Sequence, residues 1–391
     1  MIRASGCCSF GGLEMQDVAT ENIGENRTER PISDQSGPRE DASRHEHLLA
    51  GVSRTFALTI PQLPDGLREA VTNAYLLCRI ADTIEDDPHL DADTKDAFHS
   101  AFLDAAETGR GADDFAQALW PRLAPGTLPA EIELIRESHQ VLQMTHQLLP
   151  RQRAAILRCL TTMSRGMSQF ERSRSRTGLE DVAEFERYCY FVAGVVGEML
   201  TELFCSHSPE IEARRDELAA RAVSFGLGLQ MTNILKDVWD DYEHGVCWLP
   251  RDVFERYGYD LKEFQPHHNG NGPAFAASMK HLVGITHGHL RKALEYTLAI
   301  PNDETGIRRF LIWAALLAAS TLRNISADPL FTEGAHVKVS RRKVKTIVAL
   351  SNASIRSNFG LSVLFNAAAR DLPLESGNES STTTGNKSKT Q

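Results

Sequence analysis

The stretch QMTNILKDVWDDYEHGVCWLP, residues 230–250, carries the most informative pattern in the sequence. Asn233, Asp237 and Asp241 recur every four residues, so on a helix they form one polar stripe that ends near Gly245, where a helix should stop. Carboxylates at this spacing repel by roughly 0.2–0.5 kcal/mol per pair, and near a helix C-terminus they oppose the helix dipole. A purely structural helix gains nothing from this arrangement, whereas a bound cation would turn the unfavourable electrostatic energy into a favourable one.

A second acidic cluster closes the helix that we expect at Asp65–Asp86. Asp82, Glu85 and Asp86 stand just before Pro88, again at a C-terminal end. One such end is most simply a solvated charged turn, but two with the same four-residue spacing favour a shared function. Hard oxygen ligands suit Mg²⁺, which keeps several waters and bridges carboxylates to substrate phosphates. Two such helices facing each other therefore predict a magnesium site for a diphosphate leaving group.

Cationic side chains accompany both acidic ends. Arg79 precedes Asp82 by one helical turn, Lys236 adjoins Asp237, and Arg54 lies on the segment leading into the first acidic helix. Arginine suits bidentate contact with a diphosphate, and lysine suits a point-charge contact. Taken singly, Arg79 and Lys236 are more simply helix-face ion pairs.

Composition excludes several classes of protein. The chain has 391 residues, 42% of them hydrophobic, and a net charge of −10, which argues against nucleic-acid binding. Seven cysteines without a C-x-x-C motif indicate reduced thiols in a cytoplasm-like compartment. No targeting segment is evident, and the most apolar run, Phe310–Leu322, is too short to span a bilayer and predicts a buried core helix. We therefore expect a soluble protein without a transmembrane anchor.

Long amphipathic segments separated by Pro and Gly dominate the chain, so we predict one all-α domain over residues 45–372. Residues 1–44 and 373–391 are polar and lack periodicity, which predicts disorder. The other expected helices are Thr94–Thr108, Ala130–Gln147, Gln152–Arg172, Leu179–Cys205, Pro209–Tyr242, Ala274–Ala299, Glu304–Arg323 and Arg341–Ala369.

Gly194 and Gly197 fall inside one of these helices, where each costs roughly 1 kcal/mol against Ala. Such glycines indicate close approach of another helix or of a ligand. Tyr188 and Phe191 lie one turn apart beside them. These two rings are either ordinary core packing or the wall of an apolar tunnel whose aromatic faces stabilise a carbocation. Tyr75 and Phe225, taken on their own, are expected to be core residues.

The sequence resembles the squalene/phytoene synthase family of head-to-head prenyl transferases, and most closely its squalene-forming members. The matching stretches are SRTF (53–56), YLLCRIADTIEDD (75–87), YCYFVAGVVG (188–197), QMTNILKDVWDD (230–241) and, more weakly, GAHVKVSRRK (334–343). The resemblance implies an all-α isoprenoid synthase fold and the condensation of two farnesyl diphosphates. It also implies Mg²⁺ and, for the reductive step, NADPH. The pocket must exclude water, and the apolar helices around Val192–Leu203 and Phe310–Leu322 are expected to supply its dry wall.

The resemblance assigns roles to particular residues. The implied magnesium ligands are Asp82, Glu85, Asp86, Asn233, Asp237 and Asp241. The residues implied to bind or orient the substrate diphosphates, or to line the pocket, are Ser53, Arg54, Tyr75, Arg79, Gln230, Asn233 and Lys236. Tyr188 matches the acid/base position, and Arg54 and Arg79 are implied to assist catalysis. Lys338 and Arg341 fall near a basic segment linked to NADPH.

One departure from the family pattern concerns the residue after Gly245. Relatives commonly have an arginine there, whereas this chain has Val246. How the second diphosphate is held is therefore open, and Lys236 or Arg251 are candidates to compensate.

Several alternatives remain open at this point. Within the family, a dehydrosqualene or phytoene synthase would omit the reductive step. A class I terpene cyclase or chain-elongating prenyl transferase is more distant, because the acidic motifs are not of the D-D-x-x-D type. A non-catalytic helical isoprenoid-binding protein is a different class. A lipophilic product would favour peripheral membrane contact, although no dedicated amphipathic anchor is evident.

Overall fold

The computed structural model describes residues 38–53, 56–263 and 271–374, and of residues 38–43 it describes the backbone alone. All the regular secondary-structure elements within these ranges are helices. The first half contains α1 Pro38–Val52, α2 Phe56–Thr59, α3 Leu67–Asp86, α4 Ala92–Thr108, α5 Ala112–Leu119, α6 Pro129–Arg136, α7 Ser138–Gln147 and α8 Pro150–Arg172. The second half contains α9 Val182–Cys189, the short π-helix η3 Tyr190–Gly194, α10 Val195–His207, α11 Pro209–Glu212, α12 Arg215–Lys236, α13 Val238–Glu243, α14 Arg251–Arg256, α15 Gly272–Ala299, α16 Thr305–Ala327, α17 Gly334–Val337, α18 Arg341–Ser354 and α19 Asn358–Ala368. The predicted all-α fold is confirmed.

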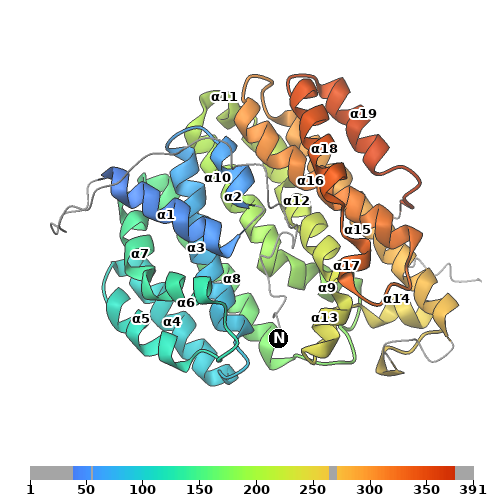
Figure 1. Ribbon diagram of the computed structural model, residues 1–391, viewed down its shortest axis with the longest axis horizontal. Helices are drawn as coiled ribbons and strands as arrows, with labels where there is room; N and C mark the ends of the chain where they lie inside the picture. Colours follow the sequence, from blue (N-terminus) through green and yellow to red (C-terminus); the bar gives the residue numbers. More distant parts are fainter. Residues whose placement is uncertain (1–37, 54–55, 264–270, 375–391) are drawn as a thin grey trace, which may run out of the picture.

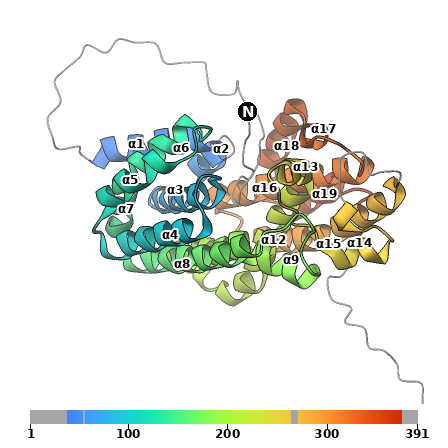
Figure 2. The ribbon, with the colours of Figure 1, turned by 90° about the horizontal axis from the view of Figure 1, so that it is seen from below.

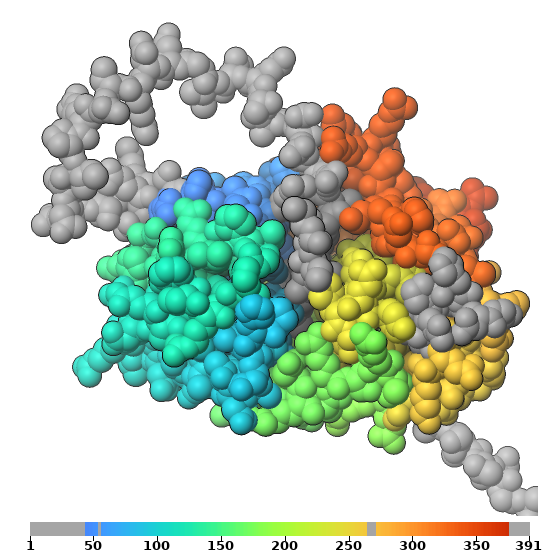
Figure 3. Space-filling view, turned by 60° about the horizontal axis from the view of Figure 1, so that its bottom comes forward, coloured from blue at the N-terminus to red at the C-terminus, as the bar shows by residue number. Residues whose placement is uncertain are grey.

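The helices form two groups with α10 and α12 between them. Figure 1 shows α1–α7 on one side of the molecule and α14–α19 on the other. Figure 2, seen from below, shows the same division, with α8 and α12 running across it. In the space-filling view of Figure 3, blue-to-cyan residues form one side of the surface and yellow-to-orange residues the other. The acidic helix α3 belongs to the first group and α13 to the second.

Glycines bring the central helices into close contact. A Cβ added to Gly197 would lie 2.1 Å from the carbonyl oxygen of Ala222, and one added to Gly226 would lie 2.1 Å from that of Ala193. Because no larger side chain fits at either position, α12 can press directly against η3 and α10. This is the close helix approach that the glycines in this segment predicted.

Two helices, Val182–His207 and Thr305–Ala327, are long and apolar enough to cross a membrane by length and composition alone. Buried residues make up 61% and 72% of their most apolar windows. This burial is typical of core helices, and Phe310–Leu322 within the second is the buried core segment that the sequence predicted. The five cysteines in the described ranges are all buried thiols outside any disulfide.

Several expected helices differ from the observed ones. Helix α1 begins at Pro38, so residues 38–44, which the sequence analysis assigned to a disordered segment, are helical. The expected helix Pro209–Tyr242 is divided into α11, α12 and α13. The expected helix Arg341–Ala369 is two helices, because the side chain of Ser357 accepts a hydrogen bond from the backbone N–H of Gly360 and starts α19. The outer bounds of the domain stay a prediction.

Candidate active site

A cavity of about 1260 Å³, including its open part, lies among α2, α3, α10, α12 and α16. Residues of five helices and of the segments beside them line it, and most of these residues are apolar. Its aromatic lining consists of Phe56, Tyr75, Phe225 and Phe310. The cavity is therefore a large, mainly apolar compartment inside the helical bundle.

Two of the cavity walls come from the helices that the sequence analysis proposed for them. Ala193, Val196 and Gly197 line it from the segment Val192–Leu203. Helix α16 contributes Phe310, Ala314, Leu317, Ala318 and Thr321, which share one helix face at three- and four-residue spacings.

The aromatic residues of the cavity are not the expected pair. The ring of Tyr188 stacks on Trp248 with centroids 3.9 Å apart and meets Phe170 at 5.1 Å. Neither Tyr188 nor Phe191 is among the described residues that line the cavity. Phe225 belongs to the buried core and Tyr75 packs against it, as expected, but both also line the cavity. Spacing along one helix could not reveal this, since it depends on which helices pack together.

One part of the cavity lining is polar and cationic. Asn233 and Lys236 reach it from the end of α12, and Lys338 reaches it from the residue after α17. The Nζ atom of Lys236 lies 3.0 Å from Oδ2 of Asp237. Burial raises the pKa of Asp237 above its ordinary value, while Lys236 and Lys338 both act to lower it. Lys236 and Lys338, the two cations that act on Asp237, both line the cavity, so the second acidic motif lies beside it.

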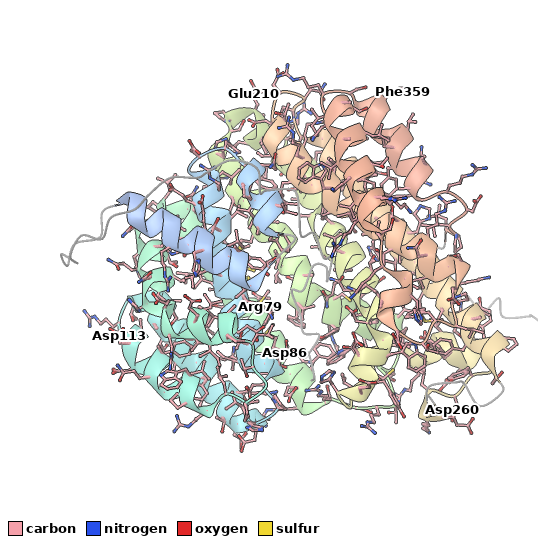
Figure 4. The ribbon with its side chains drawn as sticks, viewed as in Figure 1. Arg79, Asp86, Asp113, Glu210, Asp260 and Phe359 are labelled. Carbon is pink, nitrogen blue, oxygen red and sulfur yellow. The ribbon has the colours of Figure 1, made fainter. Side chains whose placement is uncertain are left out.

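The structure brings the two acidic helix ends together. Asp82 is fully buried on α3, and burial raises the pKa of Asp86 to about 7, with Arg79 opposing and Glu85 adding to the rise. The pKa of Asp241 is also well above its ordinary value, through burial and through repulsion by neighbouring carboxylates that include Asp86. In Figure 4, Asp86 lies on the part of α3 that is turned toward the middle of the molecule. The carboxyl groups of α3 and α13 therefore act on each other across the gap between the two helix groups.

The polar stripe of residues 233–241 does not lie on a single helix, as the sequence analysis assumed. Asp237 has φ −98° and ψ 15°, and it separates α12 from α13. The four-residue hydrogen bonds nevertheless continue, from Asp237 N–H to the Asn233 carbonyl at 2.8 Å and from Asp241 N–H to the Asp237 carbonyl at 2.9 Å. The three side chains therefore keep a helical succession through the junction.

Arg79 is held by carboxylates from two helices. Its guanidinium forms an ion pair with Glu131 of α6 and lies 3.9 Å from Asp82. Burial acts to lower the pKa of Arg79, but Glu131 and Asp82 outweigh it and the pKa is raised. The sequence analysis missed Glu131, which stands 52 positions away. Arg79 is consequently fixed, charged and adjacent to the first acidic motif.

A cation also approaches the end of α13, near Val246. Val246 itself is buried. Arg174, just beyond α8, donates a hydrogen bond to the backbone carbonyl of His244 at 3.3 Å, and its charge acts to lower the pKa of Asp241. The guanidinium of Arg176 lies 5.5 Å from the ring centre of Tyr242. The sequence analysis did not single out either arginine, since both precede α13 by more than sixty positions.

The remaining predicted site residues lie in varied surroundings. The hydroxyl of Ser53 accepts a hydrogen bond from the backbone N–H of Phe56 at 3.0 Å, whereas Arg54 lies outside the described residues. Gln230 is buried on α12 but is not part of the described cavity lining. Arg341 is exposed at the start of α18, and Arg251 starts α14 with its backbone N–H bonded to the Leu179 carbonyl.

The acidic residues fit a magnesium ion. Among the described residues, no three His, Cys, Asp or Glu side chains converge closely enough to form a complete ion site by themselves. Mg²⁺ usually takes one or two carboxylates together with waters and substrate phosphates. Buried carboxyls that repel one another, such as Asp86 and Asp241, are a donor set that a divalent cation would stabilise.

An all-α bundle that encloses an apolar cavity beside two acidic helix ends defines the class of isoprenoid synthases. The family model for squalene/phytoene synthases matches residues 49–343 of this chain. The chain belongs to the squalene/phytoene synthase family, which confirms the resemblance.

Curated relatives and solved structures agree with this family. The chain is similar to a squalene synthase of Candida albicans (29% identical over 293 residues, 73% of this chain and 62% of the relative) and to one of Botryococcus braunii (32% over 273 residues, 68% and 55%). The chain thus spans less than two thirds of the length of both relatives. Its fold matches a TcSQS–ligand complex with a TM-score of 0.68 at 23% identity, covering 85% of this chain and 98% of that one. A dehydrosqualene synthase matches with a TM-score of 0.58 at 21% identity, covering 82% and 98%.

Proposed function

We propose that this protein condenses two molecules of farnesyl diphosphate head to head to give presqualene diphosphate, and reduces this product to squalene with NADPH. The observation that carries the proposal is the meeting of two buried acidic helix ends, on α3 and α12–α13, beside a large apolar cavity. The relatives named squalene synthase support the same activity. A Mg²⁺ ion, when bound, would neutralise the departing diphosphate.

The residues of the acidic ends divide the work of holding the metal and the diphosphates. Asp82, Glu85 and Asp86 on one side, and Asn233, Asp237 and Asp241 on the other, are the proposed metal ligands. Arg79 and Lys236 would neutralise the negative charge on the diphosphate oxygens of the substrates. Each of the two side chains is already held in position by a carboxylate. This arrangement stabilises the negative charge that develops as the first allylic carbon–oxygen bond breaks.

The cavity provides the conditions for carbon–carbon bond formation. Its apolar walls exclude the water that would trap an allylic cation as an alcohol. Two prenyl chains held side by side react as if at very high concentration, which lowers the entropic part of the barrier. The rings of Tyr75, Phe225 and Phe310 line this space, where aromatic side chains can stabilise positive charge. The proton lost on cyclopropane closure goes to the released diphosphate; Tyr188, the other candidate acceptor, stacks on Trp248 outside the described cavity lining.

The second half-reaction concerns the reductant. NADPH, when bound, supplies the hydride that quenches the rearranged cation. Lys338 is suited to bind NADPH because it lines the cavity, and Arg341 follows it at the start of α18. A dehydrosqualene synthase, which omits the hydride step, is the second candidate, and a solved protein of that name has a similar fold. We further propose a cytoplasmic location with peripheral membrane contact, because both products are lipophilic.

Product analysis tests the proposal. Purified protein with farnesyl diphosphate and Mg²⁺ should form presqualene diphosphate, and added NADPH should convert the product to squalene, as measured by mass spectrometry. Dehydrosqualene with no response to NADPH would favour the second candidate. Absence of any C30 product, together with no stabilisation by Mg²⁺ and a non-hydrolysable diphosphate analogue, would favour a non-catalytic binding protein.

A further inference from the structure

The segment after α16 differs in charge from the rest of the chain. Residues 334–370, which contain α17, α18 and α19, include seven Lys or Arg residues and neither Asp nor Glu, although the whole chain has a net charge of −10. Three of these cations, Arg341, Arg342 and Lys343, occupy the first turn of α18, where the helix dipole disfavours positive charge. Helix stability therefore does not account for their placement.

The same segment exposes large apolar side chains. Phe359 and Val363, one turn apart on α19, are 80% and 47% exposed, and Leu350 on α18 is 49% exposed. The opposite face of α19 is also apolar, since Leu361 and Phe365 are buried in the core. In Figure 4, Phe359 projects at the outer end of the red helices. A helix that is apolar on both faces normally has both faces covered.

The inner side of α18 adjoins the active-site cavity. Leu317 and Val339 line the cavity, and both pack with Val344 of α18 in one small apolar cluster. Ile347 and Val348 pack against the same cluster. The basic, apolar outer surface is thus separated from the cavity by little more than the thickness of one helix.

We propose that the outer faces of α18 and α19 form a docking surface for an anionic lipid bilayer. Phe359 and Val363 enter the boundary between headgroups and acyl chains, and Arg342 and Lys345 contact acidic headgroups. Basic charge beside exposed apolar side chains is the chemistry that an anionic bilayer surface recognises. The proposal locates the membrane contact proposed above and does not depend on the reaction catalysed.

The test is flotation of the full chain with lipid vesicles. The wild-type protein should float with vesicles of phosphatidylcholine containing about a third phosphatidylserine, and less with phosphatidylcholine alone. The double variant Phe359→Ser/Val363→Ser should lose at least about five-fold in bound fraction with both. Arg342→Gln/Lys345→Gln should lose the preference for phosphatidylserine and the sensitivity to salt.

Matched measurements separate docking from folding and from catalysis. Leu149→Ser, which removes an apolar side chain that is 58% exposed before α8, should float like the wild type. Circular dichroism and turnover of farnesyl diphosphate in detergent should be unchanged in all these variants, so a failed reaction would not affect the flotation result. Wild-type protein that stays with the solution, or equal losses for Leu149→Ser and the α19 variant, would overturn the proposal.

Discussion

The carboxyl group of Asp86 lies in surroundings that oppose its own ionisation. Burial raises its pKa from 3.8 to about 7, so the folded protein holds a proton there that the unfolded chain has already lost. The contribution of this group to stability is therefore fully present below its unfolded pKa and falls as pH rises between these two values. A cation bound beside this carboxyl group would offset the cost of ionising it.

Replacing Asp86 should separate stability from function. Asp86→Asn removes the ionisable group, so in metal-free buffer at pH 8 its Tm should exceed that of the wild type, by roughly 1–2 °C for each kcal/mol relieved in a domain of this size. The difference should shrink as pH falls toward 4, and catalytic activity should be lost. Thermal unfolding at several pH values measures the first effect. A lower Tm for the variant at pH 8 would contradict this account of the site.

Arg174 offers a second test on the scale of a residue. If it supplies the cation that Val246 cannot, Arg174→Ala should lower kcat/KM for farnesyl diphosphate by about 10- to 100-fold, as expected for a lost charge-assisted contact. Arg172→Ala is the control, because Arg172 is also exposed but pairs with Asp93 and Asp96 of α4. Equal kinetics for the two variants would show that Arg174 has no such role.

Site residues could be predicted from the sequence only where their pattern is local. The four-residue spacing of Asp82 with Asp86 is visible in the sequence because one helix carries both. Glu131 and Arg174 could not be found in this way, since their partners stand 52 and 70 positions away. Their roles depend on how α6 and the segment after α8 pack against the acidic helices.

At the level of helices, the contact of η3 and α10 with α12 positions the cavity. Gly197→Ala would place a methyl group 2.1 Å from the carbonyl oxygen of Ala222, so the two backbones must move apart. We expect a loss of roughly 1–3 kcal/mol in the free energy of unfolding, measured by urea denaturation, and reduced activity because Gly197 lines the cavity. Gly126→Ala is the control, since nothing lies within 4 Å of the added atom. An unchanged Gly197→Ala protein would show that this contact is looser than described.

The sequence predicts where helices occur better than it predicts the residues at which they begin and end. Helix α3 lies within two residues of its predicted range because Pro64 and Pro88 punctuate it locally. The junction at Asp237 has no Gly or Pro to mark it, and the short helices α2, α14 and α17 are too brief to show a period. Tertiary packing sets these features.

On the scale of the whole molecule, the two helix groups each contribute half of the site. One group supplies the acids of α3, the other supplies α13 and the apolar wall of α16, and α12 lies between them. The sequence predicted both acidic ends and two apolar walls, but the aromatic lining by Tyr75 and Phe225 appears only when the groups pack together. Neither group alone carries both acidic ends.

The most direct measurement is diphosphate release from farnesyl diphosphate by variants of the two acidic ends. Asp82→Asn on α3 and Asp241→Asn on α13 should each reduce the Mg²⁺-dependent rate at least about 100-fold while the circular dichroism spectrum stays that of the wild type. Asp104→Asn, an exposed position on α4, should retain full activity. If either Asp82→Asn or Asp241→Asn releases diphosphate at the wild-type rate, the two helix ends do not form one catalytic site.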